Sequence, residues 1–151
     1  MKSEELKKRT KKYAIEIIKL VQSLPKDRVA DVIGKQLLRS GTSVGANYRS
    51  ACRARSKADF ISKMKIVEEE ADESSYWLEL IEEAKIYENE VIKPVMKETT
   101  ELLSIAVASI QTARKHLWNF SYIFSLVFIR QSSFVNLQYP FQSIQKVIVR
   151  L

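Results

Sequence analysis

The sequence predicts an all-α protein, an antiparallel up-and-down four-helix bundle with an atypical apolar C-terminal tail. Three observations support this fold. The 151 residues include only three glycines and three prolines, too few for the turns of a β-sandwich or of repeated βαβ units. Apolar residues recur at steps of three and four in four successive segments, which is the pattern of amphipathic helices. Short connections between these segments favour antiparallel neighbours.

The first two helices are expected over residues 4–24 and from Asp27 to Ala51. Pro25 separates them, because proline cannot continue a helix. Their apolar stripes consist of Tyr13, Ile17, Leu20, Leu24, Val29, Ile33, Leu37, Val44, Tyr48 and Ala51. Each helix therefore has one face that can join a shared core.

Gly41 and Gly45 lie within the second helix, where each glycine costs about 1 kcal/mol relative to alanine. Because residues four apart lie one above the other on a helix, we interpret the pair, with Ser40 and Ala46, as a low groove where a second backbone approaches closely. A phosphate-binding loop is the alternative, but the spacing is wrong and no Lys-Ser/Thr follows. Asn47 is polar on the apolar side of this helix, so we expect it to hydrogen-bond across the bundle.

The third helix is expected to begin at the stretch 56–59, which resembles a capping box with aspartate in place of glutamate, and to end near Lys85. The fourth starts near Glu90, with Pro94 tolerated in its first turn, and ends near Trp118. The stripe positions are Phe60, Met64, Val67, Ala71, Ser74 or Ser75, Leu78, Ile81 or Glu82, Val95, Leu102, Ile105 or Ala106, Ser109 or Ile110, and Leu117.

Residues 119–151 differ in kind from the rest, so we assign the bundle to residues 1–118 and a C-terminal extension to residues 119–151. The extension holds no acidic residue, and its apolar run 122–129 is too short to span a bilayer as a helix. The residues that alternate as in a half-buried strand are Val135, Leu137, Tyr139 and Phe141. The extension is therefore expected to be either strand-like or disordered.

Positive charge is concentrated in the first half of the chain. Residues 1–65 carry 17 lysines and arginines against six acidic residues, whereas residues 66–101 carry three against 12. A basic first half can bind phosphate polyanions, or it can bind the acidic segment of a neighbouring copy. Both interpretations remain open at this point.

The sequence offers no convincing catalytic or metal-binding set. A di-metal site in a helical bundle needs Glu-x-x-His pairs, but Ala113 stands three residues before the only histidine, His116. We therefore interpret the acids of the third helix as a solvated face. Cys52 is interpreted as a half-buried helix residue rather than a nucleophile, because His116 is the one imidazole that could serve as its base. We expect no enzymatic activity, no cofactor and no metal.

The cellular compartment is predicted from cysteine usage and from the start of the chain. A single cysteine, Cys52, cannot form an internal disulfide, and the chain opens with a Lys-rich stretch rather than an apolar signal. We therefore expect a cytoplasmic protein with no membrane association.

Arginines gather around the end of the second helix, and they are the strongest functional signal in the composition. The planar guanidinium of arginine grips phosphate, and clustered cations release counterions when they bind nucleic acid. The predicted phosphate contacts are Arg9, Lys11, Lys12, Arg49, Arg53 and Arg55. The neighbouring aromatic residues Tyr76 and Trp77 are interpreted as core or interface residues rather than as a platform for base stacking.

The stretches LLRSGTSVGANYRSA (residues 37–51) and SKADFISKMKIVEEEADESSYWLELI (residues 56–81) carry a family resemblance. From about residue 10 to 118, the chain resembles the bacterial four-helix-bundle family of 23S rRNA intervening-sequence proteins. That family resembles in turn the accessory protein of diversity-generating retroelements, a pentameric assembly of four-helix bundles that binds nucleic acid and a reverse transcriptase. Family members usually finish soon after the fourth helix, so the C-terminal extension has no counterpart in the family pattern.

The resemblance implies a non-enzymatic, cytoplasmic homo-oligomer, in particular a homopentamer, that binds RNA or DNA through a basic surface. The alternative is a protein-interaction scaffold, for example an accessory subunit of a reverse transcriptase, whose basic half serves self-assembly. The residues that match the family pattern, and that the resemblance marks as determinants of fold and assembly, are Arg39, Ser40, Ser43, Gly45, Asn47, Phe60, Lys63, Glu73, Tyr76, Trp77 and Leu78.

Overall fold

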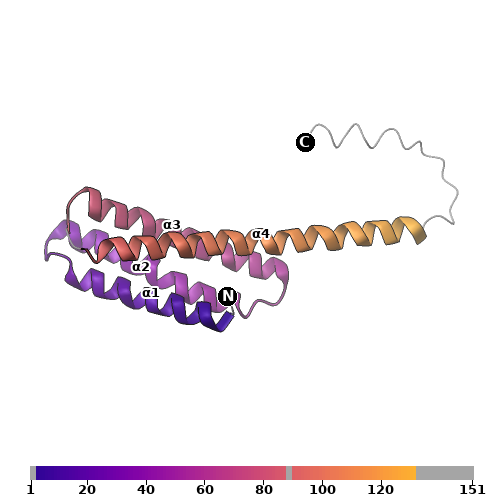
Figure 1. Ribbon diagram of the computed structural model, residues 1–151, viewed down its shortest axis with the longest axis horizontal. Helices are drawn as coiled ribbons and strands as arrows, with labels where there is room; N and C mark the ends of the chain where they lie inside the picture. The colour runs from indigo at the N-terminus through magenta and orange to yellow at the C-terminus, as the bar shows by residue number, and fades with distance from the viewer. Residues whose placement is uncertain (1–2, 88–89, 132–151) are drawn as a thin grey trace, which may run out of the picture. The chain divides into compact units, whose positions relative to one another are not determined.

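Four helices make up the part of the chain that the structure describes. The computed structural model describes residues 3–87 and 90–131, with side chains for residues 3–87 and 90–115. The helices are α1 (Ser3–Ser23), α2 (Arg28–Ala51), α3 (Lys57–Glu83) and α4 (Ile92–Gln131). Figure 1 shows α1, α2 and α3 running alternately up and down beside the first part of α4. No strand occurs within the described residues, so the predicted all-α four-helix bundle is confirmed.

The helix starts follow the capping chemistry of the sequence. The Asp27 side chain accepts hydrogen bonds from the backbone N–H groups of Val29 and Ala30, at 2.8 and 3.0 Å, and so begins α2. At the start of α3, the Ser56 hydroxyl accepts the Asp59 N–H at 3.1 Å. The Asp59 carboxylate in turn accepts the N–H of Arg55, the residue before the N-cap, at 2.9 Å. The aspartate version of the capping box is therefore confirmed. Its second bond differs by one residue, because Asp59 accepts the N–H of Arg55 instead of the N–H of the N-cap residue Ser56.

The fourth helix is longer than the sequence predicts. Its expected end near Trp118 is wrong, because α4 continues to Gln131. Residues 119–131 are therefore helical rather than strand-like or disordered. No glycine or proline occurs between Pro94 and Pro140, so nothing in this stretch terminates a helix. The alternating residues Val135, Leu137, Tyr139 and Phe141 lie outside the described part of the chain.

The chain divides into two units, Met1–Leu117 and Trp118–Leu151, and the bundle core lies in the first. The predicted stripes supply most of this core, and its fully buried side chains include Ile17, Leu37 and Leu78. Val29 is an exception, with 58% of its surface exposed. In the first turn of α2 its neighbour Ala30 is the residue that points into the core. The buried face of this helix therefore begins one residue later than predicted. No described helix is long and apolar enough to cross a membrane.

The glycine pair of α2 lies against α1. A Cβ atom on Gly45 would stand 3.2 Å from the backbone carbonyl oxygen of Thr10, and one on Gly41 would stand 2.8 Å from Cγ1 of the buried Ile17. Neither position leaves room for a side chain, so the two helices approach to near-backbone contact. The interpretation of Gly41 and Gly45 as a close-packing groove is confirmed. The inclusion of Ala46 is wrong, because Ala46 is exposed, and Ser40 is bonded to Ser74 of α3.

A layer of buried hydroxyl groups connects the four helices at the level of this groove. The Tyr13 hydroxyl lies 2.9 Å from the Thr99 hydroxyl of α4, and the Ser74 hydroxyl of α3 donates to the Ser40 hydroxyl of α2, also at 2.9 Å. Burial raises the pKa of Tyr13, whereas hydrogen bonds with Thr99 and Ser74 act in the opposite direction. Because each of these buried groups has a partner, the layer fixes the register of the helices without leaving a polar group unsatisfied.

Substitution at Gly45 is expected to test the close-packing groove. Gly45→Leu places a side chain against the Thr10 carbonyl, where the rigid backbone of α1 cannot yield, so we expect a loss of about 1–3 kcal/mol or more in unfolding free energy. Ala46→Leu is the matched control, because Ala46 is exposed on the same helix. The measurement is thermal and urea unfolding of both variants, and equal stability of the two would contradict the packing account.

Candidate nucleic-acid interface

Two of the predicted phosphate-binding arginines meet at the connection between α2 and α3. Arg53 and Arg55 are exposed on this connection, and Arg49 is exposed in the last turn of α2. None of the three forms a salt bridge with another described residue. A shallow hollow at the connection is lined by Ser50, Arg53, Arg55, Ser56, Asp59 and Lys63. The structure thus brings Arg53 and Arg55 together and places Lys63 beside them, and phosphate binding by these residues stays a prediction.

One carboxylate shapes this hollow. Asp59 accepts hydrogen bonds from the side chain of Lys63 and from the Arg55 N–H. The hydrogen bond from Lys63, followed by the bond from the Arg55 backbone, lowers the pKa of Asp59, so this group is ionised at neutral pH. Asp59 therefore holds the connection in place and offsets the charge of Lys63. The guanidinium groups of Arg53 and Arg55 remain exposed to solvent.

The N-terminus of α1 extends the positive surface towards Arg49. The Ser3 hydroxyl lies 3.3 Å from the Cys52 sulfur, which places the start of α1 beside the end of α2. The pKa of Glu4 is lowered mainly by Lys7, and the charge of Arg49 contributes. An acid at this end of the bundle thus lies in a positive environment.

Arg9 does not belong to this surface. Its guanidinium donates to both carboxylate oxygens of Glu98 on α4, at 2.7 and 2.8 Å, and also to Glu101. These acids, Glu98 foremost, raise the pKa of Arg9. A bidentate arginine–carboxylate pair is among the stronger ion pairs in proteins, so Arg9 clamps α1 to α4 and its charge is already balanced. We therefore leave Arg9 out of the proposed binding surface.

Lys11 and Lys12 are exposed on α1. The Lys12 ammonium lies 3.7 Å from Glu16 one turn later. Lys11 forms no salt bridge with a described residue. Both lysines remain available to a partner, because a surface ion pair such as that of Lys12 is worth under about 1 kcal/mol.

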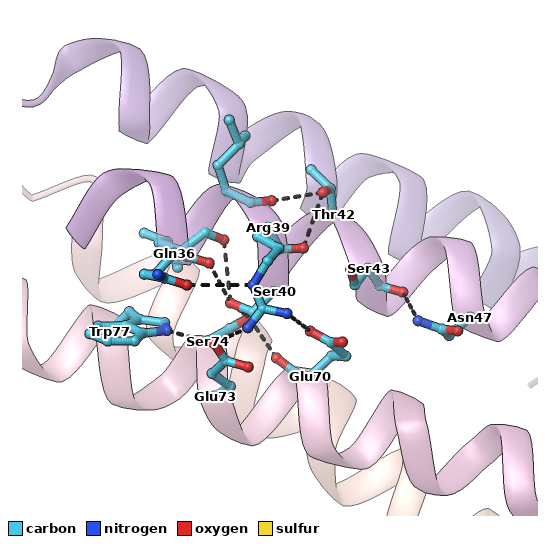
Figure 2. Close-up of polar contacts among 12 residues, drawn as sticks. Gln36, Arg39, Ser40, Thr42, Ser43, Asn47, Glu70, Glu73, Ser74 and Trp77 are labelled. Carbon is cyan, nitrogen blue, oxygen red and sulfur yellow. Dashed lines mark hydrogen bonds and ion pairs between the residues drawn. The ribbon is translucent and has the colours of Figure 1, made fainter. Parts of the chain in front are cut away.

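The family-pattern residues form a second polar cluster, between α2 and α3 (Figure 2). Arg39 donates to the Glu73 carboxylate, and the Trp77 indole N–H donates to the same oxygen at 3.0 Å. The hydrogen bonds from Trp77 and then Arg39 lower the pKa of Glu73. Tyr76 packs edge-on against Trp77 with ring centroids 5.0 Å apart. The cluster therefore joins the two helices at the surface of the bundle.

Glu70 lies in the same cluster but in a different environment. Its Oε2 atom is buried without a hydrogen bond in the described residues, 3.9 Å from Arg39 Nη1. Burial raises the pKa of Glu70, and the charge of Arg39 only partly opposes this effect. Arg39 thus connects one carboxylate of lowered pKa, Glu73, with one of raised pKa, Glu70.

The remaining pattern residues serve mainly packing and helix geometry. Leu78 is fully buried, and Phe60 packs half-buried against the core. The expectation that Asn47 hydrogen-bonds across the bundle is wrong, because its amide donates to the Ser43 carbonyl of its own helix at 3.0 Å. A half-buried Asn47 reaches the backbone one turn earlier, as short polar side chains in helices commonly do.

Cys52 ends α2 rather than lying within it, and it is half-buried as predicted. Burial and a hydrogen bond with Cys52 raise the pKa of the nearby Tyr48 to about 12. The two residues line an apolar hollow with Leu6, Phe60 and Ile105. The side chain of His116 lies outside the described part of the chain. No cluster of three His, Cys, Asp or Glu residues that could hold a metal occurs among the described residues.

Sequence reasoning missed the acidic partners of the basic residues. Glu98 and Glu101 lie 89 and 92 positions from Arg9, and a pattern along one helix cannot indicate such a pairing. The i,i+4 spacing of Asp59 and Lys63 was a usable signal, because residues at this spacing are neighbours on a helix.

Comparison with known proteins agrees with this architecture. The model of the 23S rRNA-intervening sequence protein family matches residues 2–108. A crystal structure of a protein with unknown function from the S23 ribosomal protein family of Bacteroides thetaiotaomicron is 37% identical, with a TM-score of 0.67, and the match covers 74% of this chain and 99% of that one. No curated protein matches the chain. These helices therefore define a small bundle protein of the S23 type. The chain belongs to the family of 23S rRNA-intervening sequence proteins.

The Glu73 cluster is expected to give the fold a pH-dependent contribution. Because the folded-state pKa of Glu73 is lowered, its ionised form stabilises the fold above the ordinary pKa, and this stability is lost as the pH falls through the lowered pKa. Glu73→Gln should therefore be less stable than the parent at pH 7, by under about 1 kcal/mol at this partly exposed site, and this difference should shrink as the pH falls from 7 through the lowered pKa. Urea unfolding across this pH range measures the difference, with the exposed Glu82→Gln as control. A gap that widens in acid would contradict the assignment.

Proposed function

We propose that this protein is a non-enzymatic, cytoplasmic, homo-oligomeric nucleic-acid-binding protein with RNA as its preferred ligand. The observation that carries the proposal is the arginine surface of Arg49, Arg53 and Arg55, whose guanidinium groups are exposed and form no salt bridge with a described residue. Exposed guanidinium groups grip phosphate oxygens in a planar, bidentate way. Belonging to a family named for rRNA supports RNA over DNA.

The local environment favours a phosphate backbone over a small anion. Arg53 and Arg55 line an open hollow together with Ser50 and Ser56, and the ion pair of Asp59 and Lys63 also lines it. Hydroxyl groups and arginines are common donors to phosphate oxygens, and such contacts position nucleic acid without reading its sequence. Binding through this surface should therefore depend on salt more than on base sequence.

The exposed aromatic and aliphatic residues of α3 support a second function. Tyr76 is 53% exposed and Ile66 is 39% exposed, and exposed apolar residues of this size commonly contact another protein. A protein-interaction scaffold, for example an accessory subunit of a reverse transcriptase, would use these residues instead of the arginines. Self-assembly, in particular as a homopentamer, is compatible with either function.

Removal of the arginine surface is the test of the primary proposal. We expect Arg49→Ala, Arg53→Ala and Arg55→Ala together to weaken binding to a structured rRNA fragment at least about tenfold at physiological salt. The slope of log affinity against log salt should fall by roughly one for each phosphate that the variant no longer binds. Fluorescence anisotropy titrations from low to physiological salt, with a matched DNA duplex alongside, measure both quantities.

A control variant separates local contact from net charge. Lys26, Arg28 and Lys97 are exposed and lie away from the α2–α3 connection, so their replacement by alanine removes the same charge elsewhere. Equal reductions of affinity in the two triple variants would indicate non-specific attraction, and unchanged affinity of the arginine variant would contradict the proposal. RNA binding that disappears at physiological salt in the parent would favour the scaffold function.

A further inference from the structure

The outer face of α1 combines exposed apolar residues with lysines. Ile15 and Ile18 are 42% and 37% exposed, although a solvated helix face normally carries polar residues. Lys8, Lys11 and Lys19 are exposed around them. In chain order, the first four of these five residues follow one another at steps of three and four: Lys8, Lys11, Ile15 and Ile18. They therefore share one side of the helix. We call these five residues the basic face.

The outer face of α3 has the same design with the opposite charge. Ile66 and Tyr76 are exposed, and Glu69, Asp72 and Glu83 are exposed beside them. These five residues, named here the acidic face, also follow helical spacing. None of the three acids forms a salt bridge with a described residue, and neither do Lys8, Lys11 and Lys19 of the basic face.

A shallow hollow beside the acidic face is suited to lysine side chains. It is lined by Lys65, Glu68, Glu69, Asp72, Leu103 and Val107. Leu103 and Val107 come from α4 and provide apolar surface, while Glu68, Glu69 and Asp72 of α3 provide three carboxylates. A lysine binds such a site well, because its aliphatic stem packs on apolar surface while its ammonium group meets the acids. The one cation there, Lys65, leaves the hollow acidic overall.

We infer that the basic face of one copy of this chain packs against the acidic face of a second copy. The two faces match in charge, in their paired exposed apolar residues and in length, since ten residue steps separate Lys8 from Ile18 and Ile66 from Tyr76, about 15 Å of helix in each case. Within one chain the faces do not meet, because every residue of both faces is exposed to solvent, whereas α1 and α3 approach each other through the buried residues Tyr13 and Ser74.

The contact is heterologous, because it joins two different surfaces. Each copy therefore keeps one free face for the next copy, and such contacts produce rings when the rotation closes. This inference rests on the self-assembly in the proposed function and specifies how it occurs. It also assigns the basic residues of the chain to two different roles. Lys11 is assigned to assembly, whereas Arg49, Arg53 and Arg55 remain free for phosphate.

Charge reversal tests the interface. Variant one carries Lys8→Glu, Lys11→Glu and Lys19→Glu; variant two carries Glu69→Lys, Asp72→Lys and Glu83→Lys; variant three carries all six changes. Like charges across an interface are strongly unfavourable, so variants one and two should associate at least about a hundredfold more weakly than the parent and sediment as monomers at micromolar concentration. Variant three restores opposite charges in every contact and should assemble as the parent does.

Controls make each outcome decisive. Lys26→Glu, Lys97→Glu and Lys115→Glu together change the net charge as variant one does, at exposed positions outside the basic face, and should leave the assembled mass unchanged. Circular dichroism melting verifies that every variant is folded. A monomeric parent would overturn both the assembly and the interface. Variants one and two that stay assembled, or a variant three that stays monomeric, would overturn the interface alone.

RNA binding provides an independent readout. The variant with Arg49→Ala, Arg53→Ala and Arg55→Ala leaves the basic and acidic faces unchanged, so it should lose RNA affinity and still assemble with the parent's mass. A parent that binds no RNA but gives the expected masses would reject the nucleic-acid function and leave the interface standing.

Discussion

The close approach of α1 to α2 is the constraint on which the rest of the bundle depends. Gly45 allows the Thr10 carbonyl, and Gly41 allows the Ile17 side chain, to occupy the space of a Cβ atom. With α1 held this close, Tyr13 enters the centre of the bundle and its hydroxyl reaches Thr99 on α4. A larger residue at either glycine would withdraw Tyr13 from the buried hydroxyl layer, and partially satisfied polar layers are costly. Packing and hydrogen bonding therefore impose the same register on the helices.

That register also determines which charges remain free. It brings Arg9 opposite Glu98 and Glu101 on α4, and there the arginine is balanced. It places the start of α1 beside the end of α2, so the lysines of the first turns of α1 lie near Arg49. The basic residues of the sequence therefore fall into two groups. Arg9 is paired with acids of α4, and the others named here remain on the exposed surface. Only the exposed part can act on a partner, because a balanced, partly buried pair attracts little at long range.

The sequence was a good guide to features that depend on one helix at a time. Burial follows periodicity, so among the residues with described side chains the core stripes were predicted correctly apart from Val29, where the stripe begins one residue later. The side chain of Leu117 lies outside the described part of the chain. The hydrogen-bond partner of Asn47 was harder to predict, because the Ser43 carbonyl of its own helix competes with partners on the other helices. The end of α4 was predicted too early. A helix end can be located from sequence when a glycine or proline stops the helix, and neither residue occurs between Pro94 and the end of α4 at Gln131. The partners of Arg9 depend on which helices adjoin, which periodicity does not encode.

The proposed assembly and the proposed nucleic-acid binding would reinforce each other. A single α2–α3 connection offers Arg53 and Arg55 with Arg49 nearby, and three phosphate contacts alone give weak binding at physiological salt. In a closed ring every copy presents this connection to the same side, because rotation about the ring axis leaves that direction unchanged. A polyanion that binds one connection then meets the next at high effective concentration, which raises the overall affinity without any new contact. Using the lysines of α1 for assembly would therefore strengthen the arginine surface rather than compete with it.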